Sequence, residues 1–201
     1  MRHSEKVFIM KRLLLILILT FSFQTLTKAD DIRDFQIEGM SIGDSLLDFF
    51  NEDEILKNDG NYYSKKKFVT TVFNKHRKIK NYDWLQISYK RNDSKFIIYS
   101  IDGVIEFKKN YKACLKKKDI VVNELSTLFD KNNTRIDKGK HRADKSGKST
   151  YENLIFELDG GHQVVVSCLD WSKEFEKKYF DHMKVWVNHT EFKEFIISNP
   201  F

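Results

Sequence analysis

The sequence feature that most constrains the fold is a series of strand-like segments that follow one another without an intervening helix. Residues 68–73 are rich in β-branched side chains, and in residues 84–90 apolar and polar side chains alternate with the period of a half-buried strand. Residues 95–101 and 104–107 follow, joined by Asp102-Gly103, a dipeptide typical of a tight hairpin. Strands without helices between them favour an antiparallel meander over a parallel sheet.

The second half of the chain repeats this pattern. Residues 150–158 and 162–169 flank the turn sequence Asp159-Gly160-Gly161, which predicts another hairpin, and residues 183–188 alternate again. Three segments carry apolar residues at the spacing of an amphipathic helix: 45–57, 112–129 and 190–197. We therefore expect an α+β fold in which these helices cover one face of antiparallel meanders. The order of elements is that of two diverged copies of a helix-plus-meander unit.

Residues 34–50 join a strand pattern to the start of a helix. Residues 34–38 alternate like a half-buried strand, and Gly39 then interrupts the pattern. Asp44 is expected to cap the helix that follows, because its carboxylate can accept hydrogen bonds from the first free helical N–H groups. Glycine and aspartate are ordinary residues at a helix start, and their spacing here matches no phosphate-binding motif.

Residues 1–29 have the pattern of an export signal. Basic residues precede an apolar run at residues 13–23, and polar residues follow it before Asp30. This run is too short to span a bilayer as a helix, and an uncleaved membrane anchor is the alternative interpretation. We expect cleavage before Asp30 or Asp31 and a mature chain that is periplasmic or secreted.

The charge balance argues against nucleic acid as a partner. The whole chain has 35 Lys and Arg against 29 Asp and Glu, a net charge of +6. Without residues 1–29 there remain 30 basic residues against 28 acidic ones, a net charge of +2. This balance lacks the basic excess that nucleic-acid-binding domains carry. Residues 30–201 have the length of one domain, and the 17 Phe and 8 Tyr of the chain supply a sizeable core.

Residues 130–149 contain almost no apolar side chains, and we expect a mobile polar loop there. The basic residues of this segment, among them Arg142, Lys145 and Lys148, are the best candidates for attracting an anionic ligand. Residues 145–149 are similar to the end of a Walker A motif. Arg142 occupies the position of the first glycine of that motif, so we do not expect nucleotide binding.

The chain has two cysteines, Cys114 and Cys168, and both follow the export signal. In an oxidising compartment they can form a disulfide, and the alternative is two buried thiols that pack as small apolar side chains. Their spacing is not that of a CxxC redox or zinc motif. The histidines after the signal also lack the spacing of paired metal ligands, so we expect neither a metal nor a cofactor.

A catalytic alternative rests on Ser45. Residues 43–46 are similar to the Gly-Asp-Ser-Leu motif of secreted lipases and esterases, whose serine needs a distant Asp-x-x-His and following parallel β/α units. The parallel β/α units are missing from this sequence. A secreted serine hydrolase would therefore depend on a histidine that folding brings to Ser45, and the candidates are His162, His182 and His189.

Two tryptophans are candidate contact residues. Trp84 and Trp186 occupy strand positions opposite to the apolar ones. They either complete a second small core beneath residues 130–149 or form an exposed patch on the uncovered face of the sheet. Tryptophan is enriched at interface hot spots because it buries a large area with few torsions to fix.

Three strings resemble a family of small exported bacterial proteins that carry no assigned function: residues 31–50, 144–150 and 168–171. The resemblance implies export and a shared fold. More remotely, residues 39–41 before a helix and a meander look like the small outer-membrane assembly lipoproteins and the tandem inhibitor of β-lactamase, although a lipid-attachment cysteine is missing here. Because no acid, base and nucleophile converge, we expect a non-enzymatic binding or interaction module of the cell envelope whose partner is an envelope protein or an anionic ligand.

Overall fold

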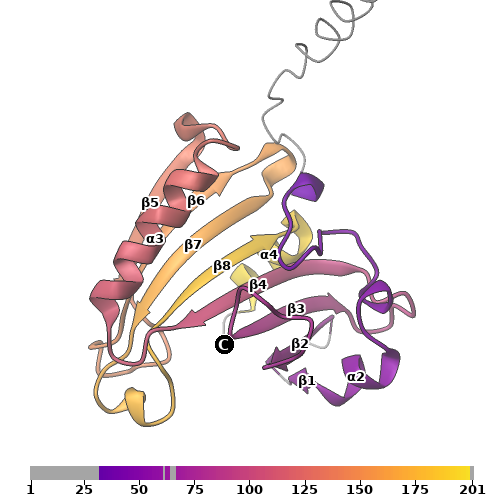
Figure 1. Cartoon of the computed structure of the whole chain (residues 1–201), viewed down its shortest axis with the longest axis horizontal. Coiled ribbons are helices and arrows are strands. Elements are labelled where there is room, and N and C mark those ends of the chain that lie inside the picture. The colour runs from indigo at the N-terminus through magenta and orange to yellow at the C-terminus, as the bar shows by residue number, and fades with distance from the viewer. Residues whose placement is uncertain (1–31, 61, 64–66, 200–201) are drawn as a thin grey trace, which may run out of the picture.

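The structure is a computed structural model that describes residues 32–60, 62–63 and 67–199. The expected signal and the cleavage site before Asp30 or Asp31 lie outside the described residues. The strands form one antiparallel sheet in the order β1-β2-β3-β4-β8-β7-β6-β5 (Figure 1). Their bounds are Asp59–Gly60 (β1), Phe68–Asn74 (β2), Trp84–Lys90 (β3), Ile98–Glu106 (β4), Thr134–Lys140 (β5), Thr150–Glu157 (β6), Gln163–Asp170 (β7) and His182–Asn188 (β8).

Three α-helices and several short 3₁₀ turns surround this sheet. The α-helices are α2 (Glu52–Lys57), α3 (Tyr111–Leu125) and α4 (Thr190–Ser198). The 3₁₀ turns are η2 (Ile32–Asp34), η3 (Leu46–Asp48), η4 (Lys131–Asn133), η5 (Asp159–Gly161) and η6 (Phe175–Lys177). The α+β class and the antiparallel meanders are confirmed. None of the helices in the described part of the chain combines the length and the apolar character needed to cross a membrane.

The two meanders meet through their last strands. β4 pairs with β8 over seven residues on each strand, from Ser100 opposite Asn188 to Glu106 opposite His182. Each meander therefore has one strand at the centre of the sheet, and its remaining strands continue outward to one edge (Figure 1). This mirrored order of strands is the arrangement expected of two helix-plus-meander units.

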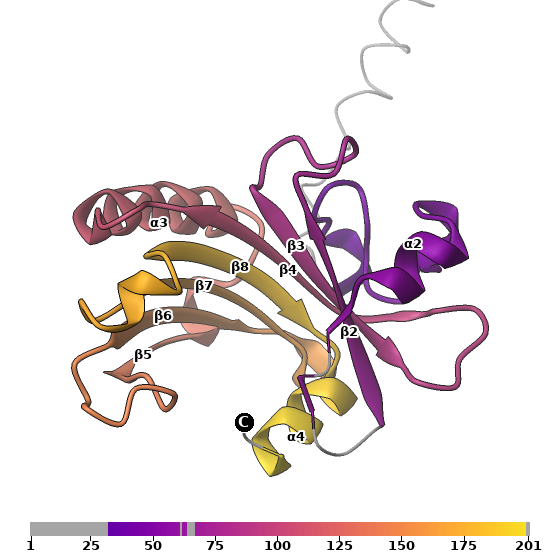
Figure 2. The same ribbon diagram turned by 90° about the horizontal axis from the view of Figure 1, so that it is seen from below.

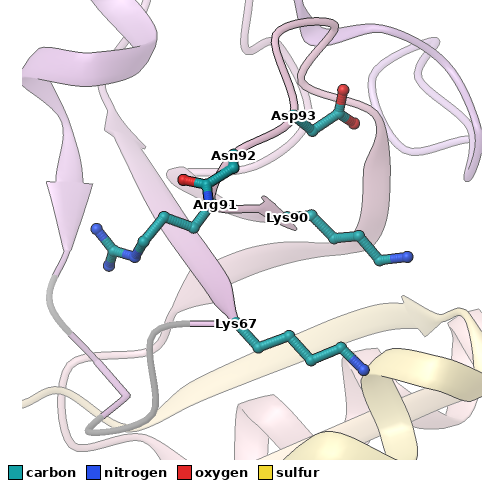
Figure 3. A pocket seen from close by; sticks show the side chains of 5 residues that line it. All are labelled: Lys67, Lys90, Arg91, Asn92 and Asp93. Atoms are coloured by element: carbon teal, nitrogen blue, oxygen red, sulfur yellow. The ribbon is translucent and has the colours of Figure 1, made fainter.

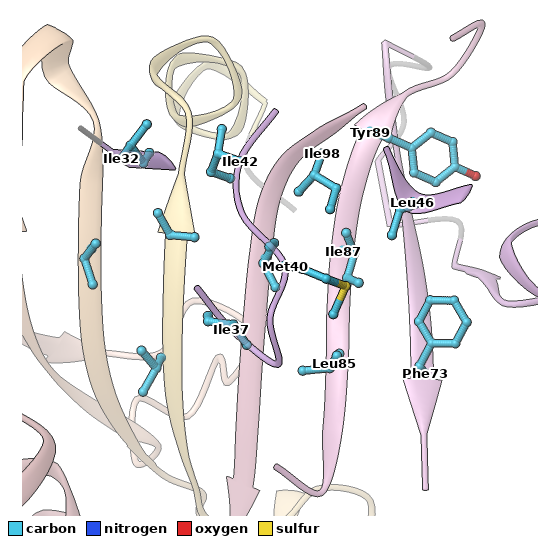
Figure 4. Close-up of a cluster of buried hydrophobic side chains, with 14 of the residues drawn as sticks. Ile32, Ile37, Met40, Ile42, Leu46, Phe73, Leu85, Ile87, Tyr89 and Ile98 are labelled. Carbon is cyan, nitrogen blue, oxygen red and sulfur yellow. The ribbon is translucent and has the colours of Figure 1, made fainter. Parts of the chain in front are cut away.

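The main core lies on one face of the sheet. Alternate residues of β3, including Leu85 and Ile87, are fully buried there, and the register continues this face through Val185 of β8. Residues 32–50 cross this face and add Ile37 and Met40 to the core (Figure 4). Because side chains alternate along a strand, burial of this set fixes which residues point to the other face.

A disulfide fixes α3 on the same face. Cys114 of α3 is bonded to Cys168 of β7, with the two Cα atoms 6.0 Å apart, so the prediction of a bridge is confirmed over that of two free thiols. One turn further along α3, buried Lys118 forms an ion pair with Glu152 of β6, which lies directly opposite Cys168. The bridge and the ion pair together attach α3 to the strands of the second meander.

The last helix lies on the opposite face, which corrects the expectation that all three helices cover one face. Phe192 and Phe195 of α4 pack with Phe68 of β2 and Tyr99 of β4 in a second cluster, separate from the main core. Figure 2 shows α3 and α4 on opposite sides of the sheet. An amphipathic stripe predicts that a helix packs on the sheet but does not specify the face.

The predicted hairpin at Asp102-Gly103 is wrong, because both residues lie within the continuous strand β4. Gly103 is needed for close packing and not for a turn. A Cβ atom on Gly103 would lie 2.6 Å from the ring of Tyr82, so only glycine lets this ring pack against the strand.

Residues 34–50 also differ from the expectation of a strand followed by one helix. Ile37 and Met40 form an isolated bridge around a tight turn, where Glu38 and Gly39 have φ angles of 53° and 80°. The expected helix at 45–57 divides into η3 and α2. Ser45 instead of Asp44 caps η3, and the carboxylate of Asp44 accepts a hydrogen bond from the N–H of Ser41 at 2.8 Å.

The expectation of a mobile polar loop at residues 130–149 is wrong for β5, which pairs with β6 along its whole length. β5 is the edge of the sheet, where side chains border solvent and polar residues are common. Its polar composition therefore reflects its place at the edge. The remaining turn, residues 141–149, connects β5 to β6.

We expect the disulfide to supply a large part of the stability. Replacing both Cys114 and Cys168 by Ala should lower the free energy of unfolding by about 4 kcal/mol, since the bridge closes a loop over a separation of 54 residues. Urea unfolding of the two proteins measures this difference. A reductant should destabilise the wild-type protein and leave the double variant unchanged, and a wild-type protein that is insensitive to reductant would contradict the expectation.

Candidate interaction surface

The sheet face opposite the main core carries a mixture of aromatic and charged side chains, and we call it the open face. Among the described helices, α4 packs on this face, at its β2–β4 end (Figure 2). The strand register places the following half-buried residues on the open face: Trp84 and Gln86 of β3, Asp102 of β4, and His182, Lys184 and Trp186 of β8. A half-buried aromatic residue on an uncovered sheet face can bury further area against a partner.

Trp84 and Trp186 share the open face, as the sequence predicts. Trp84 is opposite Val104 of β4, which is opposite Lys184 of β8. The two tryptophans are therefore two strands apart across the sheet and two residues apart along the strand direction. This offset corresponds to about 12 Å between their Cα atoms. Neither tryptophan belongs to the second cluster beneath α4, and both are half-buried on the open face.

An ion pair lies between the two tryptophans. The ammonium group of Lys184 is 2.9 Å from a carboxylate oxygen of Asp102, and it lies 4.6 Å from the centre of the Trp186 ring. The Asp102 carboxylate also accepts a hydrogen bond from the hydroxyl of Ser100 at 3.1 Å. The charges are thus held in place before any partner arrives, which lowers the ordering cost of binding.

A second aromatic group adjoins Trp84. The ring of Trp171 stacks on Tyr179 at 4.8 Å and lies 4.5 Å from His141, and its indole N–H is buried without an acceptor among the described residues. The ring of His182 lies between the rings of Trp84 and Trp171. Its centre is 6.1 Å from the ring centre of Trp84 and 6.5 Å from that of Trp171. We call Trp84, Trp171, Tyr179, His182 and Trp186 the aromatic band.

The aromatic band was only partly predictable from the sequence. Residues 171–180 contain four aromatic residues within ten positions, which is the signal that could have identified Trp171 and Tyr179. This segment contains only the short turn η6. Phe180 and Tyr179 at its end are 46% and 38% exposed, so the segment presents apolar surface beside the band.

His182 is held in its neutral form within the band. Its Nδ1 atom donates a hydrogen bond to the backbone oxygen of Phe180 at 2.8 Å, which places the proton on Nδ1. Burial lowers the pKa of His182 to about 4, and the positive charge of Lys184 contributes to this shift. Burial, followed by the charge of Lys184, also lowers the pKa of His141. Both imidazoles thus favour the neutral form beside the aromatic rings.

The basic candidates lie in the turn beside the band. Arg142, Lys145 and Lys148 are all exposed, and His141 at the start of the turn packs on Trp171. Buried Asp144 organises the turn, because its two oxygens accept hydrogen bonds from the backbone N–H and hydroxyl groups of Ser146 and Ser149, all between 2.6 and 2.9 Å. These bonds hold the pKa of Asp144 well below its usual range.

A depression at the β2–β3 end of the sheet is a weaker candidate for an anion site. It is lined by Lys67, Lys90, Arg91, Asn92 and Asp93 (Figure 3). Lys67 and Lys90 both pair with the carboxylate of Glu191, at 3.0 and 2.9 Å, and the side chain of Arg91 points away from them (Figure 3). The positive charges therefore do not converge on one point.

The arrangement around Ser45 does not support a nucleophile. The hydroxyl of Ser45 donates to the backbone oxygen of Lys95 at 2.6 Å and accepts from the N–H of Leu47 at 3.2 Å. His182 is in the aromatic band, and His162 and His189 lie together at the start of α4. The structure thus brings none of the three candidate histidines to Ser45.

His162 and His189 form the closest pair of imidazoles in the described residues, with ring centres 4.8 Å apart. The Nδ1 atom of each ring accepts a backbone N–H, from Thr190 for His162 and from Glu191 for His189. These bonds serve to cap α4 and favour the neutral rings. No group of three potential metal ligands is found in residues 32–60, 62–63 and 67–199.

Comparison with known proteins finds no matching family model, no matching curated protein and no matching solved structure. The geometry of the chain itself therefore carries the functional argument.

The turn at residues 141–149 should depend on the charge of Asp144. Because its pKa is lower in the folded than in the unfolded state, Asp144 stabilises the fold above about pH 4 and loses this contribution as the pH falls further. Asp144→Asn should therefore lower the urea midpoint at pH 7, and the difference from wild type should shrink at pH 3. Asp119→Asn, at an exposed position of α3, is the control and should change little.

His182 should make the fold sensitive to mild acid. Its pKa falls from 6.5 to about 4 on folding, so the unfolded chain binds the proton first and stability decreases as the pH drops from 6.5 to 4. His182→Asn retains an amide donor for the oxygen of Phe180 and removes the titration. The variant should show a smaller loss of stability across this range in urea unfolding, and equal slopes for the two proteins would refute the assignment.

Proposed function

We propose that this protein is an exported, non-enzymatic binding module of the cell envelope that contacts a protein partner through the open face of its sheet. The observation that carries the proposal is the placement of half-buried Trp84 and Trp186 together on the open face, with the Lys184–Asp102 ion pair between them. Half-buried tryptophans surrounded by ordered polar groups are typical of the hot spots of protein interfaces.

The chemistry of the partner follows from what borders the aromatic band. The band offers ring faces, Phe180 beside it offers an apolar side chain, and the adjacent turn carries exposed Arg142, Lys145 and Lys148. An apolar anchor on the partner would pack against the rings, and acidic residues around it would meet the turn. Binding of such a partner should weaken as salt is raised.

Export is supported by two independent features. Residues 1–29 have the pattern of a secretion signal, and the Cys114–Cys168 bridge is of the kind that persists in oxidising compartments. A binding role in the cell envelope is consistent with both. The serine hydrolase alternative lacks a supporting observation, since the Ser45 hydroxyl is engaged in capping η3.

A photo-crosslinking amino acid on the open face tests the proposal. Placed at Gln86, two residues from Trp84 and in the same cross-strand row as Trp186, it should capture a specific envelope protein in the cells that produce this chain. The same amino acid at exposed Lys117 of α3, on the other side of the sheet, is the control and should not capture that protein. Identical products from both positions would contradict the use of the open face.

Alanine substitutions then measure the contribution of each tryptophan. Trp84→Ala and Trp186→Ala should each weaken binding of the captured protein by about 30-fold, the loss expected for an interface hot spot. Ile120→Ala, which truncates a residue of α3 that is 51% exposed, should leave the affinity unchanged. Thermal unfolding of each variant separates loss of binding from loss of fold. Wild-type affinity in both folded tryptophan variants would overturn the proposal.

A further inference from the structure

The two edges of the sheet are unequal. One edge is β1, which has only two residues, whereas the other is the seven-residue strand β5. β5 pairs with β6 on one side, and no strand of the described residues pairs with its outer side. An edge strand of this length presents unpaired backbone N–H and C=O groups to any extended segment that can align with it.

The side chains of β5 are arranged differently on its two faces. Ile136 lies on the core side of the sheet, opposite Leu154 of β6, and is 64% exposed. The two neighbours of Ile136, Arg135 and Asp137, point to the open face and carry opposite charges two positions apart. Opposite charges at this spacing become directly opposed when the strand pairs with an antiparallel copy of itself.

We propose that β5 is a self-association edge, on which the β5 strand of a second copy of this chain pairs antiparallel with Ile136 at the twofold axis. In this register Ile136 faces its own counterpart on the core side. Arg135 of each copy lies opposite Asp137 of the other on the open face. The two sheets then continue into one another, and their open faces point in the same direction.

Charge selects this register over its neighbours. A twofold axis between antiparallel strands stands perpendicular to the sheet, so it must pass through a pair of identical residues. A twofold axis that passes between the two copies of a charged residue, Arg135, Asp137 or Lys138, places two like charges directly opposite each other. An axis at Gly139 places Lys138 of one copy opposite Lys140 of the other. Centring on Ile136 gives two Arg–Asp pairs and one apolar pair.

The present contacts of the charged residues are compatible with this pairing. The Nε atom of Arg135 lies 3.1 Å from Glu157, and a guanidinium group has further N–H donors. Asp137 accepts a long hydrogen bond of 3.5 Å from the amide of Asn153 and keeps capacity for another donor. Lys138 is paired with Glu152 at 2.6 Å, so its charge is partly neutralised at the edge.

Two cysteine variants of the full mature chain test the register. The described residues contain no free cysteine, since Cys114 and Cys168 are bonded to each other. Ile136→Cys should form a disulfide-linked dimer under mild oxidation, because the two thiols would face each other across the axis. Lys138→Cys, one step further on the same face, should not, since its Cα atoms would be about 14 Å apart. Equal rates of crosslinking would overturn the register.

Charge exchange tests the same pairing without crosslinking. At low salt, sedimentation should show reversible dimers for the wild-type chain, weaker dimerisation for Arg135→Asp and for Asp137→Arg, and recovery in the double variant. A wild-type chain that stays monomeric up to millimolar concentration, or a double variant no better than the single ones, would overturn the proposal. Self-association does not require Trp84 or Trp186, so its failure leaves the proposed use of the open face intact.

Discussion

The pairing of β4 with β8 is the contact on which the rest of the structure depends. Each meander alone is a small sheet with one apolar face, and the β4–β8 ladder joins the two apolar faces into one surface. In this register Ile101 lies opposite Val187 on the core side and Asp102 lies opposite Trp186 on the other. A slip by one residue would exchange these faces, so burial of the core also positions the ion pair and the tryptophans of the open face.

Local patterns predicted the strands that have one buried and one half-exposed face. The alternation of apolar and polar residues in β3 predicts the bounds of this strand, and the glycines between β6 and β7 predict the hairpin that joins them. The failures have different physical causes. At Gly103 a turn-like dipeptide serves the packing of Tyr82. β5 was missed because an edge strand needs few apolar residues, and the face of α4 was missed because an amphipathic stripe carries no information about which side of a sheet it meets.

The residues of the candidate site also divide into those that strand alternation predicts and those that it does not. Strand parity placed Trp84 and Trp186 on one face, and the structure agrees. Trp171 could not be assigned to the aromatic band from sequence, because its stacking on Tyr179 and its contact with His141 join three segments that are distant along the chain or irregular in structure. The neutral state of His182 also depends on burial and on Lys184, which only the folded arrangement brings together.

The Cys114–Cys168 bridge has a further consequence for the integrity of the chain. It encloses β5, β6 and the exposed turn at residues 141–149 in one covalent loop. A protease that cuts the backbone in this turn would leave both fragments joined through sulfur. The strands β5 and β6 on either side of the cut would also remain paired along their length. Cleavage in this exposed turn of the second meander would therefore release no fragment.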